Sequence, residues 1–225
     1  MWILVIVMLV ENMTKTSGGI FTWIYTKAMM LPGIVIGLSF HEAGHAFMSY
    51  KLGDPTPKAQ GRLTLNPIAH IDIVGFIFLL VAGFGWGEPV QIDPRYYKHR
   101  RRDELLVSFA GVVMNLLIAV VTAFIMKGMV LFLGAAAYSG IIGIIYEILM
   151  YVVAINLILM CFNLIPCPPL DGWGIITQIF NLQKYEWWYT VYRYGSLILM
   201  LLIIFNVTST IITPVYSAML KLLMF

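Results

Sequence analysis

The sequence has little charge and almost no cysteine. Only 11% of its 225 residues are charged, whereas an ordinary globular domain has about 25%. Hydrophobic residues make up 60% of the chain, and the longest polar stretch, over residues 87–104, is too short to form a soluble catalytic domain. These shortages exclude a soluble enzyme and favour an integral membrane protein with one transmembrane domain over residues 1–225.

The two cysteines, Cys161 and Cys167, both lie among apolar residues, so the sequence predicts free buried thiols and no disulfide framework. The net charge is +3, and the basic residues gather in two loops. Such clusters report membrane topology, so we expect a lipid bilayer around the chain and no nucleic-acid partner.

Long apolar runs predict an all-α polytopic membrane protein, a bundle of about four to six transmembrane helices. Four runs are long enough to cross a bilayer, at residues 28–51, 105–126, 141–166 and 194–213, and Pro214 interrupts the last of them. Residues 1–10 are apolar and could form a short or tilted span or an interfacial segment. We divide the chain into an N-terminal segment (1–27), a catalytic core (28–174) and C-terminal helices (175–225).

A shorter apolar stretch, residues 73–86, is expected to dip into the membrane without crossing it. The loops on its two sides, residues 51–62 and 95–102, contain 8 of the 14 basic residues. The positive-inside bias places both loops in the cytoplasm, and about fourteen residues cannot cross a bilayer twice. We therefore predict a re-entrant element after residue 72 and a possible edge strand near Val90.

One apolar run contains the pattern His41-Glu42-x-x-His45. Histidines four residues apart lie on one face of a helix and can bind one metal ion, with the glutamate as general base for a water molecule. The alternative is a chance pair of core histidines, but three ionisable groups in five residues are costly to bury without a function. Hydrolytic chemistry inside a membrane is the favoured interpretation.

A catalytic zinc site commonly needs a third protein ligand. Asp171 is the best candidate, because it follows three prolines in four residues and precedes Gly172. A helix must stop at those prolines, which places the carboxylate on irregular backbone among apolar residues, where zinc would supply the missing countercharge. A simple Asp-Gly turn is the alternative, and the other possible ligands are His70, Asp54 and Asp72.

The two halves of this pattern resemble the site-2 protease family of intramembrane zinc metalloproteases, in its compact prokaryotic branch without an appended regulatory domain. The resemblance runs from about residue 31 to 174 and includes the stretches 61–72, 110–115 and 163–172. It implies that His41, His45 and Asp171 bind Zn²⁺ and that Glu42 serves hydrolysis of a substrate's transmembrane segment. Val112 departs from the family, which often has proline there.

Three further residues are weaker candidates for contacts with substrate or with the oxyanion. By resemblance, Asn163 could bind substrate backbone; its alternative is an amide that bonds between helices. Asn115, within the second span, is more simply structural. His70 could reach the site from the membrane-dipping element, although a loop histidine bonded to backbone is the simpler interpretation.

We expect an intramembrane zinc metalloendopeptidase that acts on transmembrane protein substrates in a prokaryotic cytoplasmic membrane. Two other classes stay open: a metal-binding transporter or sensor, and a catalytically silent scaffold that binds helices. Glu42 distinguishes them, because only hydrolysis requires a general base. The sequence sets neither the substrate nor the oligomeric state.

Overall fold

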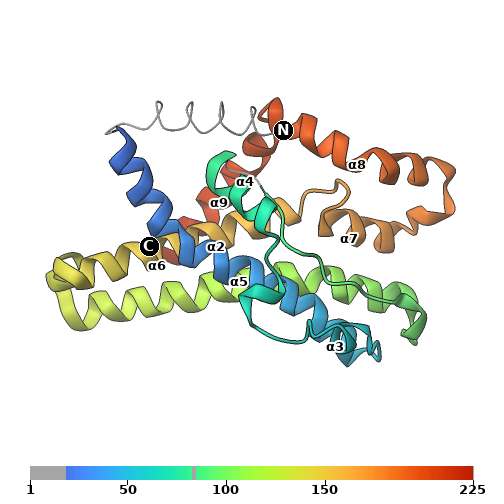
Figure 1. Cartoon of the computed structure of the whole chain (residues 1–225), viewed down its shortest axis with the longest axis horizontal. Helices are drawn as coiled ribbons and strands as arrows, with labels where there is room; N and C mark the ends of the chain where they lie inside the picture. Colours follow the sequence, from blue (N-terminus) through green and yellow to red (C-terminus); the bar gives the residue numbers. More distant parts are fainter. Residues whose placement is uncertain (1–18, 83–84, 225) are drawn as a thin grey trace.

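The computed structural model describes residues 19–82 and 85–224, and all regular structure in these ranges is helical. Five helices there are long and apolar enough to cross a membrane. They are α2 (Gly19–Lys51), α5 (Arg100–Leu133), α6 (Gly140–Asn163), α8 (Glu186–Ile204) and α9 (Val207–Met224) (Figure 1). The expected all-α polytopic membrane protein is thereby confirmed, while the proposed segment over residues 1–10 lies outside the described residues.

Shorter elements connect these helices. They are the α-helices α3 (Thr56–Ala59), α4 (Ile73–Ala82) and α7 (Asp171–Phe180), and the 3-10 turns η1 (Pro67–Ala69), η2 (Pro94–Tyr96), η3 (Gly134–Tyr138) and η4 (Leu182–Lys184). Helix α4 has ten residues, or about 15 Å of helix, which is too short for a bilayer core of about 30 Å. It agrees in length with the expected membrane-dipping element.

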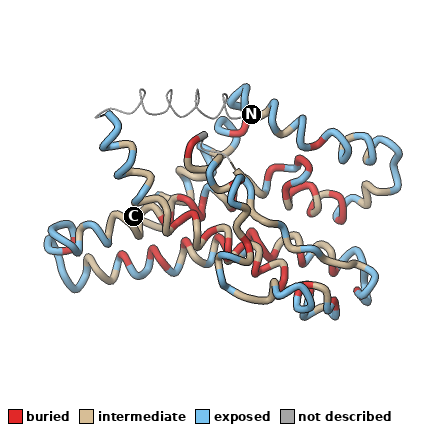
Figure 2. Tube along the Cα trace, in the orientation of Figure 1, coloured by how far each residue is buried: buried red, intermediate tan, exposed pale blue. Residues whose placement is uncertain are grey.

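The centre of the molecule is formed by α2, α5 and α6, which all pack against one another. Helices α5 and α6 run side by side in opposite directions, joined by η3 (Figure 1). Their shared core contains small and flexible side chains and is covered by α9: Val112, Ala119, Ala123, Met126, Val153, Leu157, Met160 and Cys161. Buried residues concentrate in these helices and in the segment leading to α7 (Figure 2).

Helix α2 approaches α6 closely through two glycines four residues apart. A Cβ on Gly33 would lie 2.9 Å from the Ile155 side chain, and one on Gly37 would lie 2.6 Å from that of Leu159. Small residues at this spacing let two helices meet backbone to backbone in a membrane. The close approach brings the histidine motif, one turn further along α2, against the centre of the bundle.

The end of the chain differs from the sequence prediction. We expected one span over residues 194–213 that is interrupted at Pro214, but the break lies at Phe205–Asn206, and Pro214 is inside α9. Asn206 has a φ of 59°, a left-handed conformation that asparagine tolerates better than most residues. A proline removes one backbone donor, which a transmembrane helix can accommodate, so it was the wrong place to end the helix.

A buried carboxylate ties the end of α2 to the loop before α5. Asp54 accepts hydrogen bonds from the Ser49 hydroxyl (2.7 Å), the Thr56 amide (2.9 Å) and the Asp93 amide (2.8 Å), and Ser49 also bonds the Tyr97 hydroxyl. Burial alone would raise the pKa of Asp54, but these donors hold the pKa below its ordinary value. The network fixes where α5 begins relative to α2.

Candidate metal centre

Three side chains converge where α2, α5 and α7 meet. His41 and His45 project from the same face of α2, and their Nε2 atoms are 3.1 Å apart. Asp171 Oδ2 lies 3.2 Å from His41 Nε2 and 3.4 Å from His45 Nε2. Asp171 is the first residue of α7, so the expectation that it sits on irregular backbone is wrong; the irregular segment ends just before it.

Asn115 on α5 fixes the ring of His41. Its Nδ2 donates to the Gly37 carbonyl and to Asn156 Oδ1, both at 3.0 Å. Because the Gly37 carbonyl can only accept, Oδ1 of Asn115 must face His41, and His41 Nδ1–H donates to it at 2.7 Å. In the neutral ring the proton therefore sits on Nδ1, and the lone pair of His41 lies on Nε2.

A backbone carbonyl orients the second histidine in the same way. His45 Nδ1–H donates to the carbonyl of Val107 on α5 at 2.8 Å, so in the neutral ring the lone pair lies on Nε2. Such donation from the outer nitrogen of a ring is how proteins orient histidine ligands of metals. Both Nε2 atoms face the Asp171 carboxylate, so neutral rings would direct two lone pairs and one carboxylate oxygen toward the same point.

These three atoms fit a metal cation. Asp171 Oδ2 is buried without a hydrogen-bond partner, and three facing electron pairs repel one another unless a positive charge lies between them. Space is provided by Gly111 of α5, where a Cβ would lie 2.5 Å from His45 Nε2 and 2.7 Å from His41 Nε2. Two imidazoles and a carboxylate are a ligand set typical of catalytic zinc.

The segment Leu164–Leu170 places Asp171 in this cluster. It is compact: a Cβ on Gly172 would lie 2.4 Å from the Leu164 carbonyl oxygen, so α7 begins directly against the end of α6. On its other side Pro168 packs against Gly195 of α8, where a Cβ would lie 2.3 Å from that of Pro168. One of the prolines that follow α6, Pro168, thus also contacts α8.

Glu42 lies beside the cluster and is positioned by a distant segment. Its Oε2 accepts a hydrogen bond from the Val90 amide at 3.0 Å, and no described residue donates to its Oε1. The neighbouring Glu88 amide donates to the His70 carbonyl at 2.8 Å. One carboxylate oxygen is therefore held in place while the other is free to accept a proton.

Arg62 connects the segment 88–90 to the loop that contains Ala69. Its guanidinium donates to Glu88 Oε1 at 3.0 Å and to the carbonyl of Ala69. His70 is fully buried beneath the segment, and its Nε2 bonds the Thr64 carbonyl at 2.8 Å. The backbone around Val90 is not a strand, since the described residues contain none, so the edge strand considered near Val90 is not observed.

The three weaker candidates for substrate contact lie in different surroundings. Asn115 contacts a proposed metal ligand directly, as just described. His70 reaches the site through its backbone, while its ring bonds a carbonyl. Asn163 ends α6 and donates to the Leu159 carbonyl at 3.0 Å. Roles of these three side chains in substrate binding stay predictions.

Sequence reasoning missed two groups, Asn156 and the Val90 amide. Asn156 is completely buried, bonds Asn115, and donates to the Val152 carbonyl. A polar residue within an apolar span is a signal that could have found it. The Val90 amide has no side-chain signal at all.

Comparison with known proteins finds several relatives of this chain. No family model and no solved structure matches it. The chain is 37% identical over 205 residues to a Bacillus subtilis protein named "Putative zinc metalloprotease YwhC", covering 87% of this chain and 91% of that protein. It is 26% identical to "Putative zinc metalloprotease Rip2" of Mycolicibacterium smegmatis, over 84% of this chain and 75% of the relative. A Mycobacterium tuberculosis protein of the same name is 27% identical over 66% of this chain and 56% of its own length.

Proposed function

Because the chain belongs to the site-2 protease family of zinc metalloproteases, we propose that it is an intramembrane zinc endopeptidase. Its substrates are membrane proteins, which it cleaves in or near their transmembrane segments, and its place is a prokaryotic cytoplasmic membrane. One observation carries the proposal. The convergent atoms of His41, His45 and Asp171 lie on or beside membrane-spanning helices, next to a carboxylate with one unengaged oxygen.

The ligand atoms define what each residue does. His41 and His45 offer neutral Nε2 lone pairs, and Asp171 adds one negative charge, so the site would hold Zn²⁺ with one net positive charge remaining. A bound zinc ion would acidify a water molecule and polarise the scissile carbonyl. Burial of the ligands in the bundle strengthens these electrostatic effects, because the surrounding dielectric is low.

Glu42 moves the proton. Its Oε2 is fixed by the Val90 amide, which leaves Oε1 to take a proton from the attacking water and to pass it to the leaving amine. A side chain without this second contact would rotate freely and lose that orientation.

A substrate helix must unwind here, because its peptide bonds are already hydrogen-bonded and sterically hidden. An extended substrate needs backbone partners in an apolar site, as in strand addition. The Glu88 and Val90 amides are engaged with His70 and Glu42, and Pro89 has no amide hydrogen. The amide donors that remain for pairing within the segment 87–91 are therefore those of Gly87 and Gln91.

The first test is zinc content of the detergent-purified protein. We expect about one zinc per chain in the wild type, as three-ligand catalytic sites have, and loss of zinc in Asp171→Ala. The matched control is Glu186→Ala, which removes an exposed carboxylate at the start of α8. Full zinc in Asp171→Ala would refute the ligand assignment and make His70 the next ligand to test.

The second test separates hydrolysis from transport or scaffolding. Purified enzyme is incubated with membrane vesicles of the organism that encodes the chain, and new protein N-termini are mapped by mass spectrometry. We expect new termini in or beside transmembrane segments with the wild type and none with Glu42→Gln, which should keep its zinc. Zinc-loaded wild-type enzyme that yields no new termini would favour the transporter or the scaffold.

A further inference from the structure

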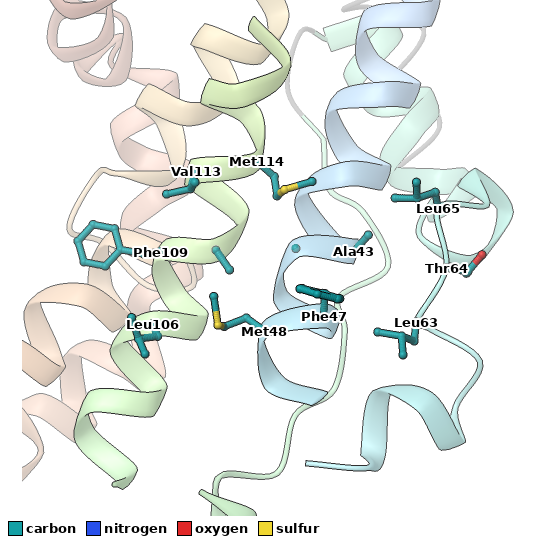
Figure 3. A pocket seen from close by; sticks show the side chains of 12 residues that line it. Ala43, Phe47, Met48, Leu63, Thr64, Leu65, Leu106, Phe109, Val113 and Met114 are labelled. Carbon is teal, nitrogen blue, oxygen red and sulfur yellow. The ribbon is translucent and has the colours of Figure 1, made fainter. Parts of the chain in front are cut away.

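An apolar groove of about 570 Å³ lies on the outer side of the bundle, between α2, α5 and the loop at residues 63–65 (Figure 3). Helix α2 lines one wall with four residues: Ala43, Gly44, Phe47 and Met48. Helix α5 lines the opposite wall with five residues: Leu106, Phe109, Ala110, Val113 and Met114. Thr64 is the one lining residue with a polar side chain.

The groove is open to its surroundings rather than filled by the protein. Phe47 is 58% exposed, Leu65 53% and Val113 45%, although all three contribute only apolar side chains to it. Phe47 and Val113 belong to helices that are long and apolar enough to span a membrane. In a bilayer this hollow is therefore filled by hydrocarbon, either from a lipid or from another protein.

On both α2 and α5, the row of residues that lines the groove is followed by a basic residue, and the two basic residues lie at the same end of the groove. On α2 the lining residues recur at helical spacing and continue to Lys51, three residues after Met48 and four after Phe47. On α5 they continue backwards to Arg102, four residues before Leu106. Side chains three or four residues apart share a face of a helix. Lys51 and Arg102 therefore lie on the groove-lining faces of α2 and α5, just past the apolar residues.

Both cations are available to a ligand. Lys51 is exposed and pairs with no acidic side chain in the part of the chain that is described. The Arg102 side chain is 63% exposed, and its Nε donates to Asp103 at 3.0 Å, which leaves its terminal nitrogens free. The positive-inside bias puts this end of the groove at the cytoplasmic surface, where anionic lipids are abundant.

We propose that the groove is a binding site for an anionic phospholipid. One acyl chain lies along the apolar floor between α2 and α5, and the phosphate is held between Lys51 and Arg102. A transmembrane substrate helix would fill the same hydrocarbon space, but it has no reason to place a negative charge at the two cations. The site goes beyond the proposed proteolysis and does not depend on it.

The test is native mass spectrometry of the full-length protein in a nonionic detergent, titrated with dioleoyl phosphatidylglycerol or dioleoyl phosphatidylcholine. Val113→Trp places an indole in the groove, and Val121→Trp is its control, because Val121 is an exposed α5 valine outside the groove. Lys51→Gln removes one cation, and Lys127→Gln is its control near the other end of α5. Inorganic phosphate is added as a competitor without an acyl chain.

We expect the wild type to prefer phosphatidylglycerol by at least about fivefold, the effect of one basic residue near an anionic lipid. Val113→Trp should lose the bound lipid, Lys51→Gln should lower the preference about fivefold because only Arg102 remains, and both control variants should bind as the wild type does. Equal lipid binding by Val113→Trp and Val121→Trp would overturn the proposal. It would also be overturned if phosphate alone displaced the lipid.

Discussion

Gly111→Ala tests the metal centre without touching a ligand. Gly111 belongs to α5 and lies against both imidazoles. A Cβ there would sit 2.5 Å from His45 Nε2 and 2.7 Å from His41 Nε2, where ordinary van der Waals contact is 3.4–4 Å. Neither ring can withdraw, because His41 is bonded to Asn115 and His45 to the Val107 carbonyl.

The methyl group must therefore displace the ligand atoms or occupy the space between them. Zinc sites tolerate ligand distances only within about 0.2 Å of their ideal values, and the overlap at Gly111 is several times larger. Loss of a group that merely orients a ligand already costs about 10–100-fold in metal affinity. We expect Gly111→Ala to weaken zinc binding by at least about 100-fold, or about 2.7 kcal/mol.

The assay is competition for zinc against a chromophoric chelator, with helical content measured by circular dichroism as a check on folding. Gly128→Ala is the control, because Gly128 lies on the same helix and has nothing within 4 Å of an added Cβ. Alanine favours a helix over glycine by about 1 kcal/mol, so the control should be as stable as the wild type or more so. Equal zinc affinity in the two folded variants would refute the reasoning.

Three further predictions follow from the contacts around the site. Asn115→Leu should weaken zinc binding by about 10–100-fold in the same chelator assay, because it frees the ring of His41; unchanged affinity would show that Asn115 only packs. Arg62→Gln should lower turnover but keep zinc content, since it loosens the segment that fixes Glu42; loss of zinc would contradict this. Asp54→Asn should destabilise the fold by about 1–3 kcal/mol at neutral pH, measured by thermal unfolding. Because the pKa of Asp54 is lowered in the folded state, its contribution is present above the ordinary aspartate pKa of about 3.9 and is lost as pH falls below it. The unfolding temperature of the wild type should therefore drop more steeply than that of Asp54→Asn under acid conditions, and parallel curves would refute this assignment.

The sequence predicted the features that depend on local spacing. His41 and His45 share a helix face because they are four residues apart, and apolar runs long enough for a bilayer became helices α2, α5 and α6. Asp171 was found because an acid after a proline block in an apolar region is costly without a partner. Its convergence with the histidines, more than 120 residues away, was inferred by chemistry and resemblance and agrees with the geometry.

Other features depend on backbone geometry that cannot be predicted from residue type. Pro214 resembles a helix end, yet the chain breaks at Asn206, because a proline costs one donor whereas a left-handed residue turns the chain. The amide that holds Glu42 belongs to Val90, an ordinary valine. Its role arises only because Arg62 and Glu88 fix the segment around it, and sequence patterns carry no signal for a backbone donor.

The proposed metal ligands and the proposed base, Glu42, are therefore oriented by separate parts of the fold. The imidazoles are oriented by α5, through Asn115 and the Val107 carbonyl, in the tightly packed centre of the bundle. Glu42 is oriented by the segment around Val90, which is held by a half-exposed Arg62–Glu88 ion pair and by one backbone bond from Glu88 to His70. Exposed ion pairs are weak, about 0–1 kcal/mol, whereas a buried amide network is costly to disrupt. Disturbing the segment around Val90 should thus impair the orientation of Glu42 before it loosens the two histidines.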